Sequence, residues 1–509
     1  MRLLPKVILI LSLGCMLASP LYAQAHVREA TVKIYTVYKS HSYNEPWQMS
    51  GQMSRTGSGC IITGRRILTD AHVVADSTFI QVKRAGQAKK YTAEVEAVAH
   101  ECDLAILKVA HDAFFSGITP VQLGSLAEVR DKVAVYGFPQ GGDELCITEG
   151  VVSRVEHQQY THSGAYLLTC QIDAAINHGN SGGPVIKDNR IVGVAFQAGN
   201  GENIGYMVPA PVIKHFLKDM DDGKYDGIPD LAVSFQKMEN PDIRLKYRMS
   251  KEQTGILVNK TYPGSPVEGI LKSGDVILSI DGTDVENDGT IEFRKGDRTS
   301  FFYLIQNRFV DDIVEFKILR DGRIERVKAK LTIPINSCRL VPQKQYGVAP
   351  TYYILGGLVF EPLTYNLLNV WAKTWGKKGV LSNLVNYYLR GEPTHDRRQL
   401  VVLVKVLADE INTGYHNLMC NIISCVNGKK ISTMKDLVNA LEANDAKYHT
   451  IVDDYGYKII LHRDKVNKRN GAILKKYKID SDRSEDLLTL QTPQSRPVTV
   501  HRVPGPALS

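Results

Sequence analysis

Ser181 is the residue whose surroundings in the sequence most directly indicate covalent chemistry. It lies in the glycine-rich run 177–184, which reads NHGNSGGP. A serine hydroxyl is a poor nucleophile until a base takes its proton and hydrogen-bond donors stabilise the oxyanion that forms. The neighbouring glycines permit a tight turn that exposes the hydroxyl, and they allow the N–H groups of Gly179, Asn180 and Ser181 to converge on one point. The same composition also suits an ordinary β-turn, so the run needs partners elsewhere in the chain.

A base and an acid precede this serine in the sequence. His72 follows the strand-like run 66–68, and Asp103 begins the apolar run 104–109, where a buried carboxylate can orient an imidazole. Taken singly, His72 could be a core histidine and Asp103 a turn cap. The order His, Asp, Ser is that of chymotrypsin-type enzymes. The combination predicts a catalytic triad in which Ser181 attacks a carbonyl carbon and His72 transfers the proton.

The elements that must position these residues are short and strand-like. Between residues 30 and 220, apolar runs alternate with turn signals, as in 31–35, 58–62 and 191–196. This cadence is typical of an all-β sandwich or barrel. One helix is expected at Ala210–Asp219, behind Pro209.

From about residue 227 the pattern changes to mixed α and β. Strands are expected around 255–258 and 274–282, with a short helix at Val267–Leu271. A second segment repeats this pattern of strand, turn and helix, with a strand at 422–426 and a helix at Met434–Leu441. The repetition indicates a tandem of related modules. The last residues are rich in Ser, Pro and charge and are expected to be disordered.

The N-terminus and the composition restrict where the protein works. Residues 1–25 combine a basic start, an apolar run and the small-x-small site Ala23-Gln24-Ala25, which predicts a secretory signal peptide. We therefore expect export, to the periplasm if the source is a Gram-negative bacterium and otherwise secretion. The remaining chain has no apolar stretch long enough to span a membrane. A formal charge of +8, spread along 509 residues, gives no basic face for nucleic acid.

No metal or organic cofactor is expected. Cys420 and Cys425 lack the spacing of a zinc site. His100, Glu101 and Cys102 are adjacent, so their side chains would alternate between faces of a strand. The seven cysteines outside the signal peptide are an odd number and do not indicate a disulfide framework.

Four motifs together resemble the Deg/HtrA serine proteases: 57–59 (GSG), 71–74 (AHVV), 103–105 (DLA) and 179–184 (GNSGGP). The segment 203–209 is similar to the family's last barrel strand, which borders the specificity pocket. Residues 352–363 and 408–415 are similar to the divergent second PDZ module of the plant-type branch. The resemblance implies an all-β chymotrypsin-like double β-barrel protease domain followed by two α+β PDZ-like modules. The expected division is a signal peptide at 1–25, the protease domain at 26–222, a first PDZ module at 227–335, a divergent second PDZ module at 345–465 and a disordered tail at 480–509.

The resemblance also implies further site residues. The amides of Gly179 and Ser181 would hold the oxyanion, with Asn180 forming the turn between them. Ala175 stands where trypsin-type enzymes carry an acidic residue, so cleavage after Lys or Arg is not expected. A specificity pocket lined by Ala175, Ile204 and Tyr206 would favour small or medium aliphatic residues.

In the first PDZ module, the resemblance places a peptide-binding loop and strand at Leu231, Ala232, Val233 and Ser234. They would bind extended peptide by strand addition. A plain structural strand remains the alternative, because Pro229-Asp230 depart from the usual glycine-rich loop. The resemblance further implies homo-oligomers built from trimers.

Two residues near the triad depart from the family pattern. Asp70 stands where the family usually has Asn, and a carboxylate there could raise the pKa of His72. We expect its side chain to point away from the histidine. His178 stands where Pro or a small residue is common, and it is expected to be a solvated loop residue.

The sequence therefore predicts a serine-type endopeptidase that hydrolyses unfolded or damaged exported proteins in protein quality control. One alternative is a chaperone or peptide-binding scaffold with little or no proteolysis. Another is a processing protease with a single substrate.

Overall fold

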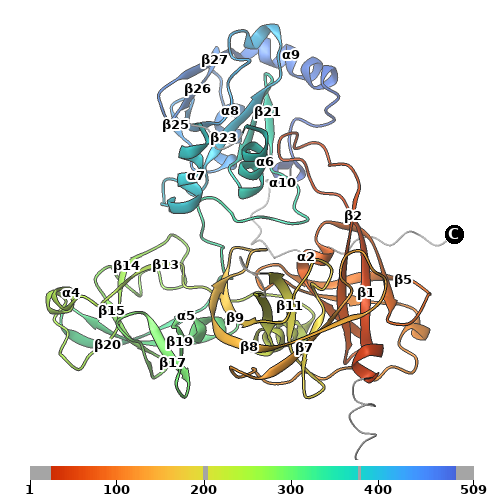
Figure 1. The fold of residues 1–509 in the computed structure, drawn as a ribbon. Coiled ribbons are helices and arrows are strands. Elements are labelled where there is room, and N and C mark those ends of the chain that lie inside the picture. Colours follow the sequence, from red (N-terminus) through yellow and green to blue (C-terminus); the bar gives the residue numbers. More distant parts are fainter. Residues whose placement is uncertain (1–24, 199–203, 376–379, 489–509) are drawn as a thin grey trace, which may run out of the picture.

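The computed structural model describes residues 25–198, 204–375 and 380–488. The predicted signal peptide lies almost wholly outside these residues. The chain folds into two closed β-barrels and two α+β modules, each built on an antiparallel sheet, and the first module also contains a separate two-stranded sheet. Figure 1 shows the barrels side by side, with one module beside them and one above.

The first barrel is antiparallel and closes in the order β1-β2-β3-β6-β5-β4. Its strands are β1 (Thr31–Tyr38), β2 (Met53–Ile62), β3 (Arg66–Thr69), β4 (Ser77–Arg84), β5 (Tyr91–Ala99) and β6 (Leu104–Lys108). The four-residue helix α2 (Ala71–Val74) follows β3 directly. Strand β6 is buried over Leu104–Leu107, so the turn that precedes it is drawn into the interior.

The second barrel repeats the architecture in the order β10-β11-β12-β9-β8-β7. Its strands are β7 (Lys132–Gly137), β8 (Cys146–Gln159), β9 (Tyr166–Ile172), β10 (Pro184–Lys187), β11 (Arg190–Ala198) and β12 (Gly205–Pro209). The helix α3 (Ala210–Asp219) begins behind Pro209, as predicted. Both predictions, a double β-barrel and this helix, are confirmed.

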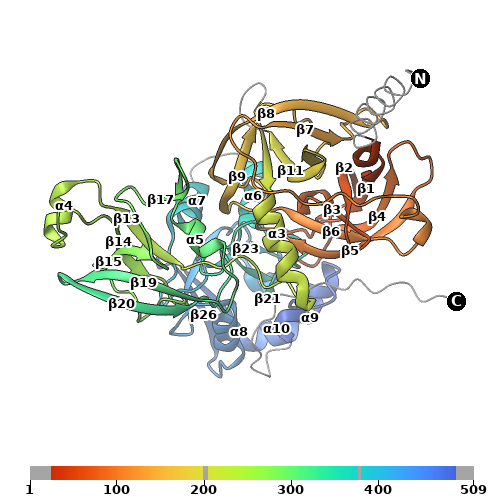
Figure 2. The same cartoon turned by 90° about the horizontal axis from the view of Figure 1, so that it is seen from below.

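The first PDZ module is a six-stranded sheet with β13 at one edge. Its elements are β13 (Val233–Lys237), α4 (Pro241–Lys246), β14 (Ile256–Thr261), β15 (Val276–Ile280), β16 (Thr283–Asp284), β17 (Thr290–Arg294), β18 (Asp297–Ser300), α5 (Phe302–Gln306), β19 (Ile313–Arg320) and β20 (Arg323–Lys330). Helix α5 lies against β9, and β18 lies against β8, so this module contacts the second barrel (Figure 2).

The second PDZ module is built around a seven-stranded sheet. Its elements are β21 (Tyr353–Leu355), β22 (Leu358–Pro362), α6 (Tyr365–Trp375), α7 (Val380–Arg390), β23 (Val401–Val406), β24 (Asn421–Val426), β25 (Lys429–Lys430), α8 (Met434–Glu442), β26 (Tyr448–Asp453), β27 (Lys458–His462), α9 (Arg463–Lys476) and α10 (Glu485–Leu488). A capping box between Thr433 and Asp436 starts α8. Tyr43, from the loop between β1 and β2, is buried in this module's core. In Figure 1 that loop extends from the first barrel toward the second PDZ module.

Two details of the sequence prediction differ from the structure. The short helix expected at Val267–Leu271 is wrong: these residues form turns, because Gly269 adopts a φ of 78° that a helix does not allow. The chain also stays ordered past residue 480, since the N–H of Ile354 donates to the carbonyl of Asp482 (2.7 Å) and α10 follows. The rest of the predicted tail, 489–509, lies outside the described residues. Within the described residues, no helix is long and apolar enough to cross a membrane.

Candidate functional site

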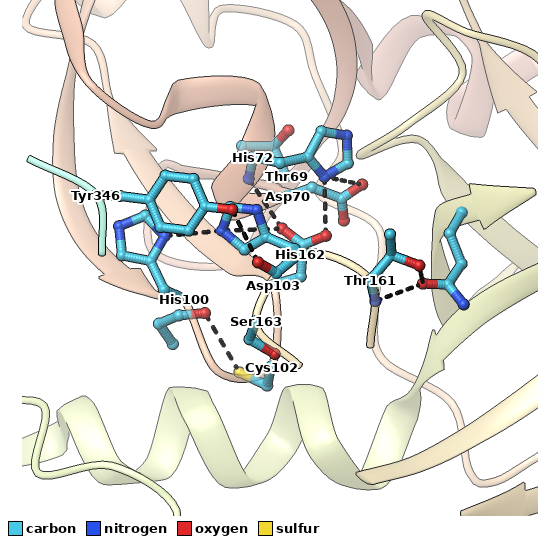
Figure 3. Close-up of polar contacts among 12 residues, drawn as sticks. Thr69, Asp70, His72, His100, Cys102, Asp103, Thr161, His162, Ser163 and Tyr346 are labelled. Carbon is cyan, nitrogen blue, oxygen red and sulfur yellow. Dashed lines mark hydrogen bonds and ion pairs between the residues drawn. The ribbon is translucent and has the colours of Figure 1, made fainter. Parts of the chain in front are cut away.

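His72 and Asp103 are held together by two hydrogen bonds. His72 lies in α2, just after β3, and Asp103 lies in the turn between β5 and β6. The Nδ1 atom of His72 is 2.8 Å from Oδ2 of Asp103, and the backbone N–H of His72 donates to Oδ1 (2.8 Å). The Asp103 side chain is 1% exposed, and its φ of 54° is the left-handed conformation that Asp adopts only occasionally. The pair has the arrangement of a base oriented by a buried acid (Figure 3).

The charge of Asp103 is stabilised by its surroundings. Burial alone would raise the pKa of Asp103. The charges of His72 and His162, together with hydrogen bonds from the ring and backbone of His72, outweigh burial and lower the pKa below its ordinary value. Asp103 is therefore an anion that can stabilise a protonated His72.

Ser181 lies on a turn whose backbone only glycine allows. Gly179 has a φ of 101°, and a Cβ atom there would lie 2.4 Å from the carbonyl oxygen of Phe138. Gly182 has a φ of 83°, and its Cβ would lie 2.2 Å from both the carbonyl oxygen of Ser58 and Oγ1 of Thr69. Such contacts are too short for any side chain, so the glycines bring this turn against the end of β3, next to the helix of His72.

Ser58 fastens the same turn to the first barrel. Its N–H donates to the carbonyl of Ser181 (2.8 Å), and its hydroxyl donates to the carbonyl of Gly179 (2.7 Å). The hydroxyl also accepts the N–H of Phe138 (2.8 Å). Ser58 is fully buried, so these bonds are shielded from water. The sequence placed Ser58 in a family motif but assigned it no role.

The amides predicted to bind an oxyanion are unengaged. Among the described residues, neither the N–H of Gly179 nor that of Ser181 donates a hydrogen bond. The adjoining carbonyls are directed elsewhere, since that of His178 accepts the N–H of Gln140 (2.7 Å) and that of Gly179 accepts Ser58. Asn180 is buried, and its N–H closes the turn onto Asn177 (3.0 Å). His178 is exposed. Within the described residues, the Ser181 hydroxyl makes no hydrogen bond to His72.

Asp70 does not point away from His72, and that expectation is wrong. Its side chain is 0% exposed, and Oδ2 lies 3.8 Å from Nδ1 of His72. Neither carboxyl oxygen has a hydrogen-bond partner within the described residues. The nearby N–H of Gly182 donates instead to the carbonyl of Ala195 (2.8 Å). Burial and the charge of Asp103 raise the pKa of Asp70 well above its ordinary value, which favours the neutral acid.

Asp70, His72 and Asp103 are also the group in the described chain whose ligand atoms lie close enough to hold a metal ion, all within 4.8 Å of one another. A metal bound there would have to displace the proton between His72 and Asp103. The arrangement present is that of a hydrogen-bonded acid and base.

The structure does not bring the three residues expected to line a specificity pocket to one surface. Tyr206 is buried in the large cluster that includes the interior of the first barrel, and Ile204 packs against the same cluster. Ala175 is exposed, and its carbonyl accepts the hydroxyl of Thr148 (3.1 Å). Met207 and Ile176, which the sequence did not single out, share a different buried cluster in the second barrel.

The residues expected to bind peptide lie at a sheet edge. Val233 and Ser234 belong to β13, which pairs with β14 on one side. Leu231 is fully buried, and Ala232 adopts a φ of 48°. The side chain of Asp230 accepts the N–H of Leu231 (2.7 Å), so a carboxyl group of the chain itself occupies one amide of the predicted loop.

The sequence did not predict the aromatic cluster that lies beside Asp103. His162 lies in the hairpin between β8 and β9, with Nε2 3.9 Å from Oδ1 of Asp103. Tyr346, from the segment entering the second PDZ module, stacks on His162 with ring centroids 4.0 Å apart. Figure 3 shows both rings beside Asp103. No motif marks either residue.

Two barrels with a His–Asp pair and a serine turn between them define a trypsin-like protease. Consistent with this class, residues 57–194 match a family model described as a trypsin-like peptidase domain. Residues 229–331 and 341–486 each match a model described as a PDZ domain.

Two plant relatives identify the family. The chain is 40% identical to the putative protease Do-like 3, mitochondrial, of Arabidopsis thaliana, over 90% of this chain and 80% of the relative. It is 41% identical to protease Do-like 4, mitochondrial, of the same plant, over 81% and 76%. The chain belongs to the Deg/HtrA family of PDZ-containing serine endopeptidases.

Solved structures agree on the fold. A structure titled as a variant of the HtrA-type protease AlgW with decapeptide has a TM-score of 0.51 and 21% sequence identity, covering 64% of this chain and 98% of that one.

Proposed function

We propose that this protease cleaves unfolded or damaged polypeptides by acyl transfer, with His72, Asp103 and Ser181 as its catalytic triad. The observation that carries the proposal is the pair of 2.8 Å hydrogen bonds between Asp103 and His72, with Ser181 on a glycine turn packed against the same strand end. Ser181 attacks the scissile carbonyl carbon, and His72 takes the hydroxyl proton and gives it to the leaving amine. Asp103 holds the imidazole and stabilises its charged form.

The oxyanion of the tetrahedral intermediate would be bound by the amides of Gly179 and Ser181. Both N–H groups lack an acceptor among the described residues, which supports this role. Removing one donor from such a site costs on the order of 10² to 10³ in rate.

The test is hydrolysis of a casein-like, disordered protein by the purified chain and by Ser181→Ala. We expect the substitution to lower the rate by about 10⁵- to 10⁶-fold, the loss typical of a removed nucleophile. The exposed Ser125→Ala, in the segment between the two barrels, is the matched control and should keep full activity. Retained cleavage in Ser181→Ala would show that another residue is the nucleophile. A wild-type chain that cleaves one defined protein and spares casein would indicate a processing protease.

We also propose that the first PDZ module binds extended peptide along β13. The edge position of this strand supports strand addition. A labelled peptide with a free C-terminal carboxylate should bind more tightly than its amidated form if the loop at Leu231 and Ala232 captures the carboxylate. Equal affinity would assign the module another mode of recognition.

We also propose that the protein is exported and that it assembles into homo-oligomers. The basic and apolar character of residues 1–25 supports export, and N-terminal sequencing of secreted protein should show cleavage after Ala25. The named plant relatives are mitochondrial, so uptake into isolated mitochondria is the competing outcome. Family membership supports homo-oligomers built from trimers of the 56.6 kDa chain, which light scattering would test.

A further inference from the structure

The turn that carries Asp103 is fastened to the hairpin between β8 and β9. The turn spans 100–103 and is closed by the N–H of Asp103 donating to the carbonyl of His100 (3.2 Å). The ring of His100 hydrogen-bonds the ring of His162 through Nδ1 and Nε2 (2.9 Å). Ser163 adds a second link, from its hydroxyl to the carbonyl of Glu101 (2.8 Å). The first barrel supplies the turn and the second supplies the hairpin, so these bonds hold the two barrels together beside the triad.

Tyr346 holds both histidine rings of this link. Its ring stacks on His162 at a centroid distance of 4.0 Å and on His100 at 4.6 Å, with interplanar angles of 20° and 22°. Its hydroxyl donates to the backbone carbonyl of His162 (2.8 Å). Offset stacking at these distances contributes beyond simple burial. Tyr346 therefore fixes both the ring of His162 and the backbone of the hairpin.

His162 faces Asp103 on the side that His72 leaves open. Oδ2 of Asp103 is taken by the ring of His72 and Oδ1 by its backbone, while Nε2 of His162 is 3.9 Å from Oδ1. His162 is 5% exposed, so an ordered water has little room to replace it. A carboxylate at this distance favours the tautomer in which Nε2 of His162 carries the proton and donates it to Nδ1 of His100.

Tyr346 reaches this position because its own segment is anchored on the first barrel. The N–H of Gly347 donates to Oδ1 of Asp76 (2.5 Å), just after the helix of His72. The carbonyl of Val348 accepts the hydroxyl of Tyr43 (3.2 Å), whose ring is buried in the core of the second PDZ module. Any movement of that module would be transmitted to Tyr346.

We propose that Tyr346, His100 and His162 are positioning residues that hold Asp103 in the orientation His72 requires, so that the segment entering the second PDZ module completes the active site. Asp103 needs such support, because its left-handed backbone is a strained conformation that persists only where the surroundings enforce it. The second PDZ module thereby controls turnover without touching substrate. This inference rests on the triad proposed above.

The experiment compares Tyr346→Ala, Tyr346→Phe and His162→Ala in the full chain, using a short fluorogenic peptide that does not need the PDZ modules. We expect Tyr346→Ala and His162→Ala to lower kcat by roughly 10- to 100-fold with KM unchanged, the scale of effect for a small displacement of a catalytic group. Tyr346→Phe keeps the stacking and should stay within about threefold of wild type. Tyr455→Ala, an exposed tyrosine of the second PDZ module, is the matched control.

A spectroscopic measurement separates positioning from general stability. The Nδ1 proton shared by His72 and Asp103 gives a low-field proton resonance, which Tyr346→Ala should shift or broaden and Tyr346→Phe should preserve. If Tyr346→Ala does not fold, His162→Gln tests the same point, because the side-chain amide can still donate to Nδ1 of His100 and should recover part of the kcat lost in His162→Ala. Unchanged kcat and an unchanged resonance in Tyr346→Ala and His162→Ala would overturn the inference. Ser181→Ala in the same assay separates the two proposals. If it abolishes cleavage while the Tyr346 and His162 variants have no effect, only the positioning role is wrong and the proposed triad stands. If Ser181→Ala is active, the proposed function itself is wrong.

Discussion

The two PDZ modules share a fold but contact the protease domain in different ways. The first module contacts the outer face of the second barrel, where α5 lies against β9. The second module reaches the hairpin beside Asp103 through Tyr346, and Tyr43 of the first barrel inserts into the core of that module. Among the described residues, the interface of the first module therefore includes no residue that contacts the triad, whereas the interface of the second module includes residues beside Asp103.

The polar groups of the two interfaces also differ. At the first interface both ring nitrogens of His157 are hydrogen-bonded, Nδ1 to Thr299 (2.7 Å) and Nε2 to Gln306 (2.9 Å). Gln306 in turn donates to the carbonyl of Tyr166 (2.9 Å).

On the other side, two buried acids have carboxyl oxygens without a hydrogen-bond partner within the described residues. Both oxygens of Asp70, beside the triad, and Oε1 of Glu361, in the second PDZ module, accept no hydrogen bond. Burial raises the pKa of Glu361 well above its ordinary value, as it does for Asp70. Unsatisfied buried groups destabilise a fold and concentrate at functional sites. The first interface also holds unpartnered buried atoms, Nη2 of Arg294 and Nδ1 of His215. What distinguishes the side around Asp103 is therefore the presence of two buried carboxyl groups with unpartnered oxygens.

The largest effect on stability is expected from breaking the first interface with His157→Ala. This substitution leaves Thr299 and Gln306 without their partner, which should lower the free energy of unfolding by about 1 to 3 kcal/mol. Thermal unfolding and hydrogen exchange in α5 would measure the loss. The exposed His178→Ala is the matched control. We expect the kcat of His157→Ala for a short peptide to equal that of the wild type. A fall in kcat as large as that of Tyr346→Ala would show that both interfaces affect the active site.

The same interface should depend on pH in a defined direction. Burial lowers the pKa of His157 below its ordinary value, and the hydrogen bond that its Nε2 donates to Oε1 of Gln306 offsets this only in part. The folded state thus favours neutral His157, whereas an exposed histidine takes up a proton below about pH 6.5. The contribution of this contact is complete above that pH and declines as the pH falls below it. The free energy of unfolding of His157→Ala should therefore fall less steeply than that of the wild type as the pH drops below about 6.5.

A smaller effect, of opposite sign, is expected from Asp70→Asn. The raised pKa means that folding disfavours the ionised carboxyl, so Asp70 destabilises the fold at every pH where the unfolded chain would ionise it, above about pH 4. Asn removes the charge, and we expect a gain of about 1 kcal/mol at pH 7 to 8 that disappears near pH 4. Thermal unfolding across pH would show this, with the exposed Asp396→Asn as control. A loss of stability at pH 8 would mean that Asp70 is a favourable, paired anion.

The sequence predicted what depends on local pattern. Apolar alternation and turn residues placed the barrel strands and α3, and the motifs around His72, Asp103 and Ser181 carry their chemistry within a few residues each. The structure brings His72 and Asp103 together because β3 and β6 are paired, with Thr69 opposite Ala105.

What the sequence missed depends on long-range packing. Tyr346 meets His162 across 184 residues, a contact that no local pattern records. The specificity residues depend on which face of β12 each side chain occupies, and successive residues of a strand face opposite sides. Tyr206 and Met207 therefore enter different cores, and the choice between them needs the register with β9 and β11.

The smallest effect is expected on the peptide affinity of the first PDZ module, when Asp230 is replaced. The side chain of Asp230 accepts the N–H of Leu231 (2.7 Å), an amide that an incoming peptide carboxylate would need. Asp230→Ala frees this donor and removes a like charge, so we expect the affinity for a peptide with a free C-terminal carboxylate to rise about three- to tenfold, the worth of one charge-assisted hydrogen bond in partial competition. Asp230→Asn keeps the acceptor and should gain less, and an amidated peptide should gain from neither. Fluorescence polarisation would measure the three affinities. If Asp230→Ala weakens binding instead, the carboxyl shapes the loop for the peptide and does not compete with it.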